Sequence, residues 1–410
     1  MSNDSTIEIA GAGPAARDAT FDLIVVGGGP SGSSAARVAA KAGLRVMVLE
    51  KSTMPRRKVC GGGVSAQALG YLDFAIPREL IDAECDGARV SFRGRAVEAR
   101  LSERIAILST RAKFDLFLLQ QAQQAGARVA YETAREVREA GDEVVVVGSA
   151  GEHRARAVII AAGAGNRLME VVRRRDEDHE YAVTLEAEIP VERPDRFGHL
   201  EGMVEIEFGV TRFGYGWIFH HGDHYSVGVG GLRSEVENPH QPMQGYLGKH
   251  GFGPKPPGLR GHTIPCGGLR RDLVKGRVLL AGDAAGFVDP FNGEGIAYAI
   301  RSGQLAGQAV TASAAAGWNL GRLREYERRA WNELGRDLRW SLWMSKAVYR
   351  FPDAFLGLFV RSKRLSEKYL EVPLHKLTYA QFVKWMLPRL PILWLQAWLS
   401  PPSTTEPAAG

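Results

Sequence analysis

Continuous apolar runs and glycine-rich turns alternate along much of the chain, which predicts a parallel sheet buried between helices. The clearest unit covers residues 21–50, where the β-branched run Phe21–Val26 predicts a strand, Ser33–Ala42 a helix and Arg45–Leu49 a second strand. Similar runs predict further strands at Val129–Tyr131, Glu143–Val147, Ala155–Ala161 and Arg277–Ala281.

Strict alternation of polar and apolar residues replaces this pattern between Tyr181 and Gly231, as expected of an antiparallel sheet with one solvated face. Hairpins are predicted for Ala88–Phe92 with Ala96–Leu101, and for Tyr215–His221 with Tyr225–Gly230. Helical periodicity marks Ser65–Tyr71, Thr110–Ala125 and nearly everything after Gly293, including an apolar stripe at Tyr326, Ala330, Leu334, Leu338 and Leu342.

The two patterns interleave, which predicts an α/β (α+β) fold in which one domain is inserted into another. We expect a Rossmann-like dinucleotide-binding domain from residues 21–72, 104–176 and 262–345, an antiparallel-sheet substrate domain from 73–103 and 178–261, and a helical region over 346–410. Residues 1–20 have neither the basic start nor the apolar core of a signal peptide, and we predict a flexible tail.

The turn after the first strand carries a dinucleotide-binding pattern, G-x-G-x-x-G, at Gly27, Gly29 and Gly32. These glycines allow a tight turn, a close approach to a pyrophosphate and close helix packing. Glu50 ends the second strand, where a carboxylate can accept hydrogen bonds from ribose hydroxyls. This order of strand, glycines, helix and acid makes an ordinary glycine-rich turn a poor alternative.

A second candidate site follows the predicted strand Arg277–Ala281. Asp283 can bond ribityl or diphosphate-proximal hydroxyls, and the amides at Gly293–Ile296, which open a helix, can stabilise negative charge on a reduced flavin ring. A capped helix start is the alternative for this segment alone. Together with the glycine loop it favours FAD over NAD.

Charge and cysteine content narrow the classes of partner. The net charge of +6 favours anionic partners, but no nucleic-acid motif is present, so we expect no nucleic acid. Three separated cysteines argue against disulfides and zinc and for a reducing, cytoplasmic location.

Together, Gly27–Glu50, Arg111 in TRAKFD and GDAAGFVDPFNGEGI resemble FAD-dependent enzymes with the glutathione-reductase type of nucleotide domain, a fold shared with p-hydroxybenzoate hydroxylase. Within that group, KVCGGG at residues 58–63 and GYGWIF at 214–219 resemble the geranylgeranyl reductase family. The resemblance covers about residues 20–340. It implies an FAD-dependent enzyme that reduces isolated double bonds in polyprenyl chains of lipids, chlorophylls or quinones.

The resemblance also implies roles for individual residues. Tyr215 and Trp217 would line a tunnel for the isoprenoid, and Cys60 would lie near the flavin. His220 departs from the family pattern, which usually has proline there, and Ala162-Gly163 replaces the common Asp-Gly. The cofactor-binding residues expected on this basis are Gly27, Gly29, Ser31, Gly32, Glu50, Lys51, Gly61, Gly62, Arg111, Asp283, Gly293, Gly295 and Ile296.

Cys60 has two interpretations. An alkene that receives a hydride also needs a proton, and Arg56, Arg57 and Lys58 could lower the pKa of the thiol enough to make it the donor. An inert, positioning or gating cysteine is the alternative.

The His220, His221, Asp223 and His224 group lies at a predicted hairpin tip. A solvated turn is favoured there over a metal site.

The segment Tyr379–Ser400 is rich in Trp and Leu but is interrupted by Pro388, Pro391 and basic residues, which makes it a poor transmembrane span. Trp385, Trp394 and Trp398 suit an interfacial anchor. Packing against the body of the protein is the alternative, and the basic run at residues 361–364 favours peripheral contact with the inner face of the membrane.

The function predicted from all of these patterns is reduction of a polyprenyl lipid or quinone tail by FAD. No second dinucleotide fingerprint is present, so the electron donor is expected to be transiently bound NAD(P)H or reduced ferredoxin. A flavin monooxygenase or halogenase, and a flavoprotein that passes electrons to quinone, are the alternatives.

Overall fold

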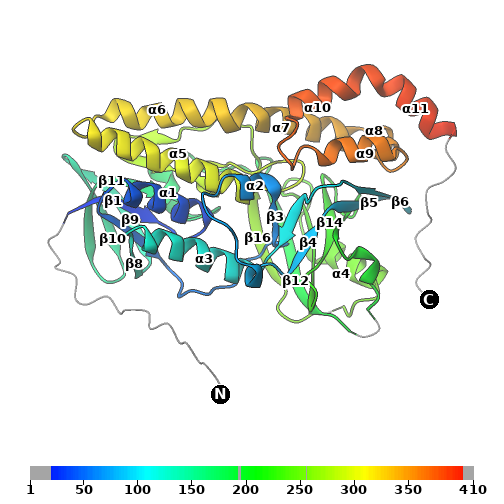
Figure 1. Ribbon diagram of the computed structural model, residues 1–410, viewed down its shortest axis with the longest axis horizontal. Coiled ribbons are helices and arrows are strands. Elements are labelled where there is room, and N and C mark those ends of the chain that lie inside the picture. The colour runs from blue at the N-terminus through cyan, green and yellow to red at the C-terminus, as the bar shows by residue number, and fades with distance from the viewer. Residues whose placement is uncertain (1–19, 193–194, 255, 400–410) are drawn as a thin grey trace.

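A computed structural model of the chain describes residues 20–192, 195–254 and 256–399 (Figure 1). The predicted N-terminal tail lies almost wholly outside the described residues, as does the end of the C-terminal region. The described part contains three sheets, helices that pack on them and a layer of C-terminal helices.

The first sheet follows the predicted apolar runs. Its main path is β17-β18-β11-β1-β2-β8, in which all neighbours except β17 and β18 run parallel. The strands of this path are β1 (Phe21–Val26), β2 (Val46–Glu50), β8 (Arg128–Tyr131), β11 (Glu152–Ile160), β17 (Val274–Lys275) and β18 (Val278–Leu280). Two further strands, β9 (Ala134–Ala140) and β10 (Glu143–Gly148), extend the sheet: β10 pairs antiparallel with β11, and β9 pairs antiparallel with β10.

Register places the ends of the central strands at one edge of this sheet. Val26 lies opposite both Leu49 and Ile160, and Ile160 lies opposite Leu280. The loops that follow β1, β2, β11 and β18 therefore converge, as ligand-binding loops do in open parallel sheets.

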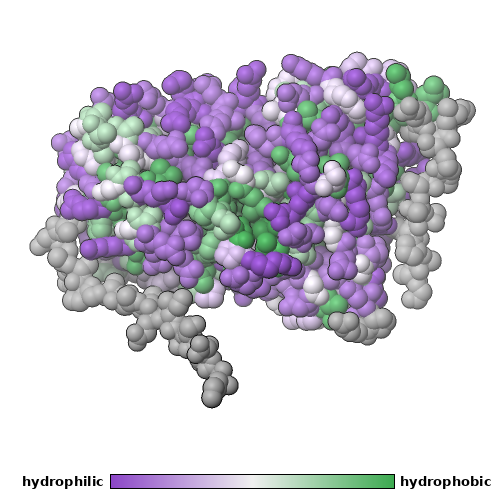
Figure 2. Space-filling view, in the orientation of Figure 1, coloured by the Kyte–Doolittle hydropathy of each residue, from purple (hydrophilic) through white to green (hydrophobic). Residues whose placement is uncertain are grey.

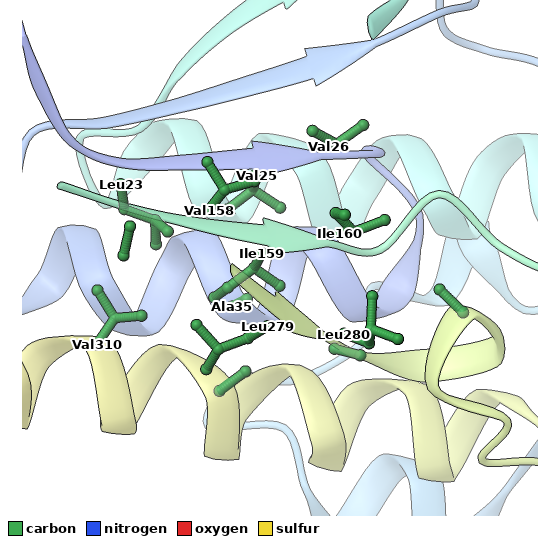
Figure 3. Close-up of a cluster of buried hydrophobic side chains, with 14 of the residues drawn as sticks. Leu23, Val25, Val26, Ala35, Val158, Ile159, Ile160, Leu279, Leu280 and Val310 are labelled. Atoms are coloured by element: carbon green, nitrogen blue, oxygen red, sulfur yellow. The ribbon is translucent and has the colours of Figure 1, made fainter. Parts of the chain in front are cut away.

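Helices cover the first sheet, and the hydrophobic core lies between these helices and the strands. Leu23, Val25, Ile159 and Leu279 point from the strands toward Ala35 of α1 and Val310 of α5 (Figure 3). Helix α5 approaches α1 so closely that a Cβ at Gly303 would lie 2.1 Å from the Ser31 carbonyl oxygen. The helices are α1 (Pro30–Lys41), α3 (Arg111–Gln124), α5 (Ile296–Ala315) and α6 (Leu320–Ala330).

The second sheet has the order β16-β12-β15-β14-β13-β5-β6 and is antiparallel except where β13 meets β5. Its strands are β5 (Gly87–Phe92), β6 (Arg95–Arg100), β12 (Tyr181–Pro190), β13 (Met203–Phe208), β14 (Gly214–His220), β15 (His224–Leu232) and β16 (Arg260–Pro265), and α4 (His240–Lys249) packs on it. A small third sheet contains β3 (Gly63–Ser65), β4 (Ala83–Cys85) and β7 (Ala106–Leu108), beside α2 (Ala66–Gly70).

The C-terminal helices form a layer beside the second sheet (Figure 1). The predicted stripe is buried from Tyr326 to Leu338, although one wide turn over Trp331–Gly335 separates α6 from α7. The Trp331 ring occupies the position that a Cβ at Gly335 would take. The layer contains α7 (Arg336–Arg350), α8 (Pro352–Phe359), α9 (Lys363–Leu370), α10 (Tyr379–Met386), the turn Leu387–Arg389 and α11 (Leu390–Leu399).

Several predicted boundaries were wrong by a few residues. Helix α1 begins at Pro30 rather than Ser33. Proline is tolerated at the first helical position, because the amide hydrogen that it lacks would have no partner within the helix. The predicted helix after Gly293 begins at Ile296, since Glu294 and Gly295 still belong to the turn. Strand β11 begins at Glu152, three residues earlier than predicted, because it pairs with the edge of β10.

Candidate functional site

A cavity of about 770 Å³ begins at the convergent loop ends of the first sheet and extends along the second sheet into the C-terminal layer. Three expected site segments, far apart in sequence, line it: the glycine loop, the 58–61 loop and residues 288–296. Tyr215 and Trp217 of β14 line it from the opposite side.

Glu50 holds the glycine loop in place. Its carboxylate accepts hydrogen bonds from the amides of Gly28 (2.8 Å) and Ser52 (3.0 Å). Gly27 has φ +107°, and a Cβ there would lie 2.5 Å from the Ala161 carbonyl oxygen. A Cβ at Gly32 would lie 1.8 Å from the Gly27 carbonyl oxygen, so both positions require glycine for the turn itself.

Gly29 and Ser31 leave a space beside the start of α1 that suits a phosphate. The nearest atom to a Cβ added at Gly29 would be Arg56 Nη2 at 3.5 Å, so this glycine is not crowded by the protein. The Ser31 hydroxyl is buried and has no hydrogen-bond partner among the described residues. An open position, an unused hydroxyl and a helix N-terminus together fit the diphosphate of FAD. Lys51 lies exposed at the rim.

Arg111 is buried at the start of α3 and forms a bidentate pair with Asp115, with distances of 2.7 and 2.8 Å. Asp115 also faces Arg56 Nη2 at 3.2 Å. Burial lowers the pKa of Arg111, but the negative charge of Asp115 and, to a smaller extent, the Cys60 sulfur outweigh burial, so the pKa is raised overall. The thiol therefore lies next to a guanidinium that stays charged.

Asp283 lies directly after β18, as predicted, and faces Lys58 Nζ at 3.9 Å. The same ammonium lies 3.2 Å from Nε2 of His262 on β16. Burial, followed by the nearby Lys58 charge, lowers the pKa of His262 to about 4, which leaves its ring neutral at pH 7. Lys58 thus connects the first sheet to the edge of the second.

The turn before α5 lies against Tyr215. The Tyr215 hydroxyl donates to the carbonyl of Asn292, and a Cβ at Gly293 would lie 2.7 Å from that hydroxyl. Gly295 and Ile296 line the cavity at the N-terminus of α5, where backbone amides lack intrahelical partners. Burial raises the pKa of neighbouring Glu294, which also lines the cavity, to about 7.

Alternate residues of β14 form one wall of the cavity. Tyr215, Trp217 and Phe219 all line it, as side chains two residues apart on a strand should. Trp217 Nε1 donates to the Ser226 hydroxyl (3.2 Å), and its ring lies where a side chain at Gly228 would otherwise project. His220, the departure from the family pattern, lies behind this wall and bonds Asp195 at 2.7 Å.

The loop that carries Cys60 is fixed from behind by His221. Nε2 of His221 bonds the Gly61 carbonyl (3.0 Å), and Nδ1 bonds Asp82 (3.0 Å). Gly62, with φ +75°, packs against Ser109 and His221 behind the loop, and Gly61 lines the cavity against Phe219. The Gly61 carbonyl and the Asp82 carboxylate both offer acceptor oxygens, so each ring nitrogen of His221 faces an acceptor.

The solvated turn predicted for the histidines was wrong at two positions. His220 and His221 are buried and pair with different carboxylates, because Asp195 and Asp82 approach from elements distant in sequence. Within residues 20–192, 195–254 and 256–399, no group of three or more His, Cys, Asp or Glu side chains is arranged to hold a metal ion.

The far end of the cavity is apolar. Its walls there come from α7, α8, α9 and the segment after α9, through Tyr349, Leu356, Phe359, Tyr369, Leu370 and Pro373. The sequence prediction missed this contribution of the C-terminal layer. It also missed the contacts of His221 and His262, whose partners Asp82 and Lys58 are distant in sequence, and the burial that raises the pKa of Glu294.

Comparisons with known proteins agree with this geometry. Residues 22–170 match the FAD-dependent oxidoreductase family model. The chain is 30% identical over 390 residues to digeranylgeranylglycerophospholipid reductase 1 of Methanothermobacter thermautotrophicus, covering 88% of this chain and 94% of that one. It is also 30% identical over 321 residues to menaquinone reductase of Mycobacterium tuberculosis, covering 72% and 77%.

Solved structures share the fold. A geranylgeranyl bacteriochlorophyll reductase-like protein from Thermoplasma acidophilum superposes with a TM-score of 0.74 at 22% identity, covering 92% of this chain and 99% of that one. A flavin-dependent brominase superposes with a TM-score of 0.67 at 18% identity, covering 92% and 98%. Because it is 30% identical to a prenyl-lipid reductase over 94% of that protein, the chain belongs to the geranylgeranyl reductase family of FAD-dependent oxidoreductases.

Proposed function

We propose that this enzyme saturates carbon–carbon double bonds in the polyprenyl chain of a lipid or quinone. The observation that carries the proposal is the continuous cavity, which joins an FAD-type loop to the apolar interior of the C-terminal layer. A polar ligand fits one end and a long hydrocarbon chain the other. The names of the two curated relatives, a prenyl-lipid reductase and a menaquinone reductase, support the same substrate class.

In this proposal the residues of the first sheet hold FAD. Gly29, Ser31 and the start of α1 take the diphosphate with Arg111 nearby, Glu50 and Lys51 lie toward the adenosine ribose, and Asp283 lies toward the ribityl chain. Gly61, Gly293, Gly295 and Ile296 surround the flavin ring. Bound and reduced, FAD supplies the hydride.

The chain's own residues orient the substrate and hold the proton. Tyr215 and Trp217 confine the prenyl chain beside the 288–296 turn, and their rings exclude water from the cavity. Cys60 holds the proton at Sγ that goes to the second alkene carbon, and Arg111 next to it stabilises the thiolate left behind. Replacing Cys60 with serine should lower alkene turnover about a hundredfold and leave FAD content unchanged.

The electron donor is proposed to be NAD(P)H or reduced ferredoxin, bound only while electrons pass to FAD. The described residues contain one dinucleotide loop of the expected form, and Gly27, Gly29 and Ser31 of that loop line the cavity. Anaerobic mixing of the FAD-loaded enzyme with each donor, followed by flavin absorbance, would identify the donor by its rate of bleaching.

The direct test is the product. After deletion of the gene, mass spectrometry of cellular lipids and quinones should reveal one prenyl species that is lighter than normal by two mass units for each double bond left unreduced. Purified enzyme with FAD and an electron donor should restore it. A halogenating or oxygenating enzyme, for which the brominase fold is the supporting observation, would instead consume oxygen and leave the prenyl chain unsaturated.

A further inference from the structure

The end of the C-terminal layer exposes apolar side chains. Apart from Tyr131, the large exposed apolar side chains of the described residues all belong to this layer or its junctions. Four of them, which we call the terminal apolar face, lie on the Leu387–Arg389 turn and α11: Leu387, Ile392, Trp394 and Leu395. Ile392 and Leu395 are 59% and 58% exposed, and the region is green at the upper right of Figure 2.

Helix α11 is nevertheless held to the protein. Leu393, between the exposed residues, is buried in the same core as α8 and α10. Trp385, which the sequence suggested as an anchor, is half-buried, with Arg364, Lys368 and Arg389 at 6.0, 6.0 and 5.2 Å from its ring centre. The exposed surface therefore consists of aliphatic residues and Trp394 beside a cluster of cations.

The charge of this layer is strongly positive. Residues 336–395 contain 11 Lys and Arg residues and four Asp and Glu residues, a surplus that exceeds the +6 of the entire chain. Such a surface repels a second copy of itself and attracts an anionic one. Apolar residues next to basic residues are typical of helices that lie in a membrane interface.

Apolar side chains of this layer also form walls of the candidate site. A small cavity of about 30 Å³ lies between α7, α8, α9 and α10, and it shares Phe291, Leu356, Phe359 and Tyr369 with the walls of the large cavity. Helix α11 packs on α8, which contributes to both cavities. No helix of the described residues is long and apolar enough to span a membrane, so contact through α11 would be at the surface.

We propose that the terminal apolar face docks on the anionic surface of a lipid bilayer. Leu387, Ile392, Trp394 and Leu395 enter the interface, and the basic residues around Trp385 contact lipid phosphates. The prenyl chain then passes from the bilayer through the C-terminal layer into the cavity; this second part rests on the proposed function.

The test uses the full-length, FAD-loaded protein and vesicles without substrate. We expect it to sediment with phosphatidylcholine vesicles that contain 30% phosphatidylglycerol, and to bind about tenfold more weakly in 0.5 M NaCl or to phosphatidylcholine alone. The double variant Ile392→Asp/Leu395→Asp should lose at least tenfold in binding, whereas Tyr131→Asp, an exposed aromatic on β8, should bind like the wild type. Equal melting temperatures and FAD content exclude misfolding.

Two results would overturn the docking proposal. One is the absence of an effect on vesicle binding, whether the wild-type protein fails to sediment with anionic vesicles or the double variant binds as well as the wild type. The other is a dimer in sedimentation velocity that only the double variant dissociates, which would make the face a contact between copies. Turnover of a detergent-dispersed prenyl alcohol tests the proposed reaction separately, because it needs no bilayer.

Discussion

Two glycines of one turn differ in what a methyl group would meet. At Gly32 it would lie 1.8 Å from a carbonyl oxygen, whereas at Gly29, which lines the cavity, its nearest neighbour would be Arg56 Nη2 at 3.5 Å. We expect Gly32→Ala to destabilise the fold by about 3 kcal/mol. Gly29→Ala should leave the melting temperature of the FAD-free protein unchanged and weaken FAD binding about tenfold, measured by fluorescence titration. Equal loss of stability in both variants would contradict this assignment.

Glu294 should make the flavin potential depend on pH. With a pKa raised to about 7 by burial, it is neutral below pH 7 and negative above it. A carboxylate beside the proposed flavin position disfavours a negatively charged reduced ring, so the midpoint potential should fall more steeply with pH above 7.

Redox titration from pH 5.5 to 8.5 checks this expectation. Glu294→Gln removes the titrating group and should remove the additional slope. An unchanged slope in that variant would show that the carboxylate lies too far from the flavin to influence it.

For individual residues, the sequence predicts best those positions that are set by the local geometry of the chain. Gly27, Glu50 and Asp283 could be placed because a strand end followed by a turn fixes their position relative to the backbone. His221 and His262 could not, since their partners Asp82 and Lys58 are more than 130 residues away and no spacing connects them.

At the scale of elements, the β14–β15 hairpin controls the loop that carries Cys60. The His221 side chain, only 2% exposed, joins Gly61 to Asp82, and burial of the pair makes its loss costly. The pKa of Asp82 is about 2 because hydrogen bonds and charge from His221 and Lys113 outweigh the effect of burial, which acts to raise it.

We expect His221→Gln to loosen this loop more than it destabilises the protein. The glutamine amide cannot span both the Gly61 carbonyl and the Asp82 carboxylate as the imidazole ring does, so one of the two hydrogen bonds is lost or weakened, at a cost of about 1–3 kcal/mol. Alkylation of Cys60 by iodoacetamide, followed by mass spectrometry, should accelerate about tenfold. His224→Gln is the matched control, because the His224 ring stacks on His221 while its Nδ1 pairs with Asp223. Equal acceleration in the control would contradict a specific role for His221.

The C-terminal helices show where an element-level prediction stops. Their apolar spacing correctly predicted helices and a buried stripe. Which tryptophan is exposed could not be read from spacing, because cations from α9 and the Leu387–Arg389 turn surround Trp385 only in the folded protein.

For the whole molecule, the interleaved patterns predicted a parallel and an antiparallel sheet built from alternating segments of the chain. Continuous apolar runs mark the buried parallel strands, and alternation of polar and apolar residues marks the antiparallel ones. These patterns could not predict that the C-terminal layer completes the cavity. The residues of that layer which line the cavity are apolar and aromatic, and nothing in the sequence distinguishes them from residues of a hydrophobic core. The division into domains remains a proposal about how these parts fold.

FAD should stabilise all of these parts together. The cavity is lined by residues of both main sheets and the C-terminal layer, so binding links them. At a hundredfold excess over its Kd, the cofactor adds about 2.7 kcal/mol, which corresponds to about 3 °C for a chain of this length. Scanning calorimetry should record one transition that moves as a unit. A shift of only part of the transition would show that the sheets unfold independently.

The contact between the Tyr215 hydroxyl and the Asn292 carbonyl has an optical consequence. It joins the wall proposed for the substrate directly to the turn proposed for the flavin, with no intervening side chain. A chain that displaces Tyr215 must then alter the hydrogen bonding around the isoalloxazine. The visible absorbance of the oxidised flavin would therefore change when a ligand binds in the substrate part of the cavity. Difference spectra could rank candidate ligands by affinity before any turnover is measured.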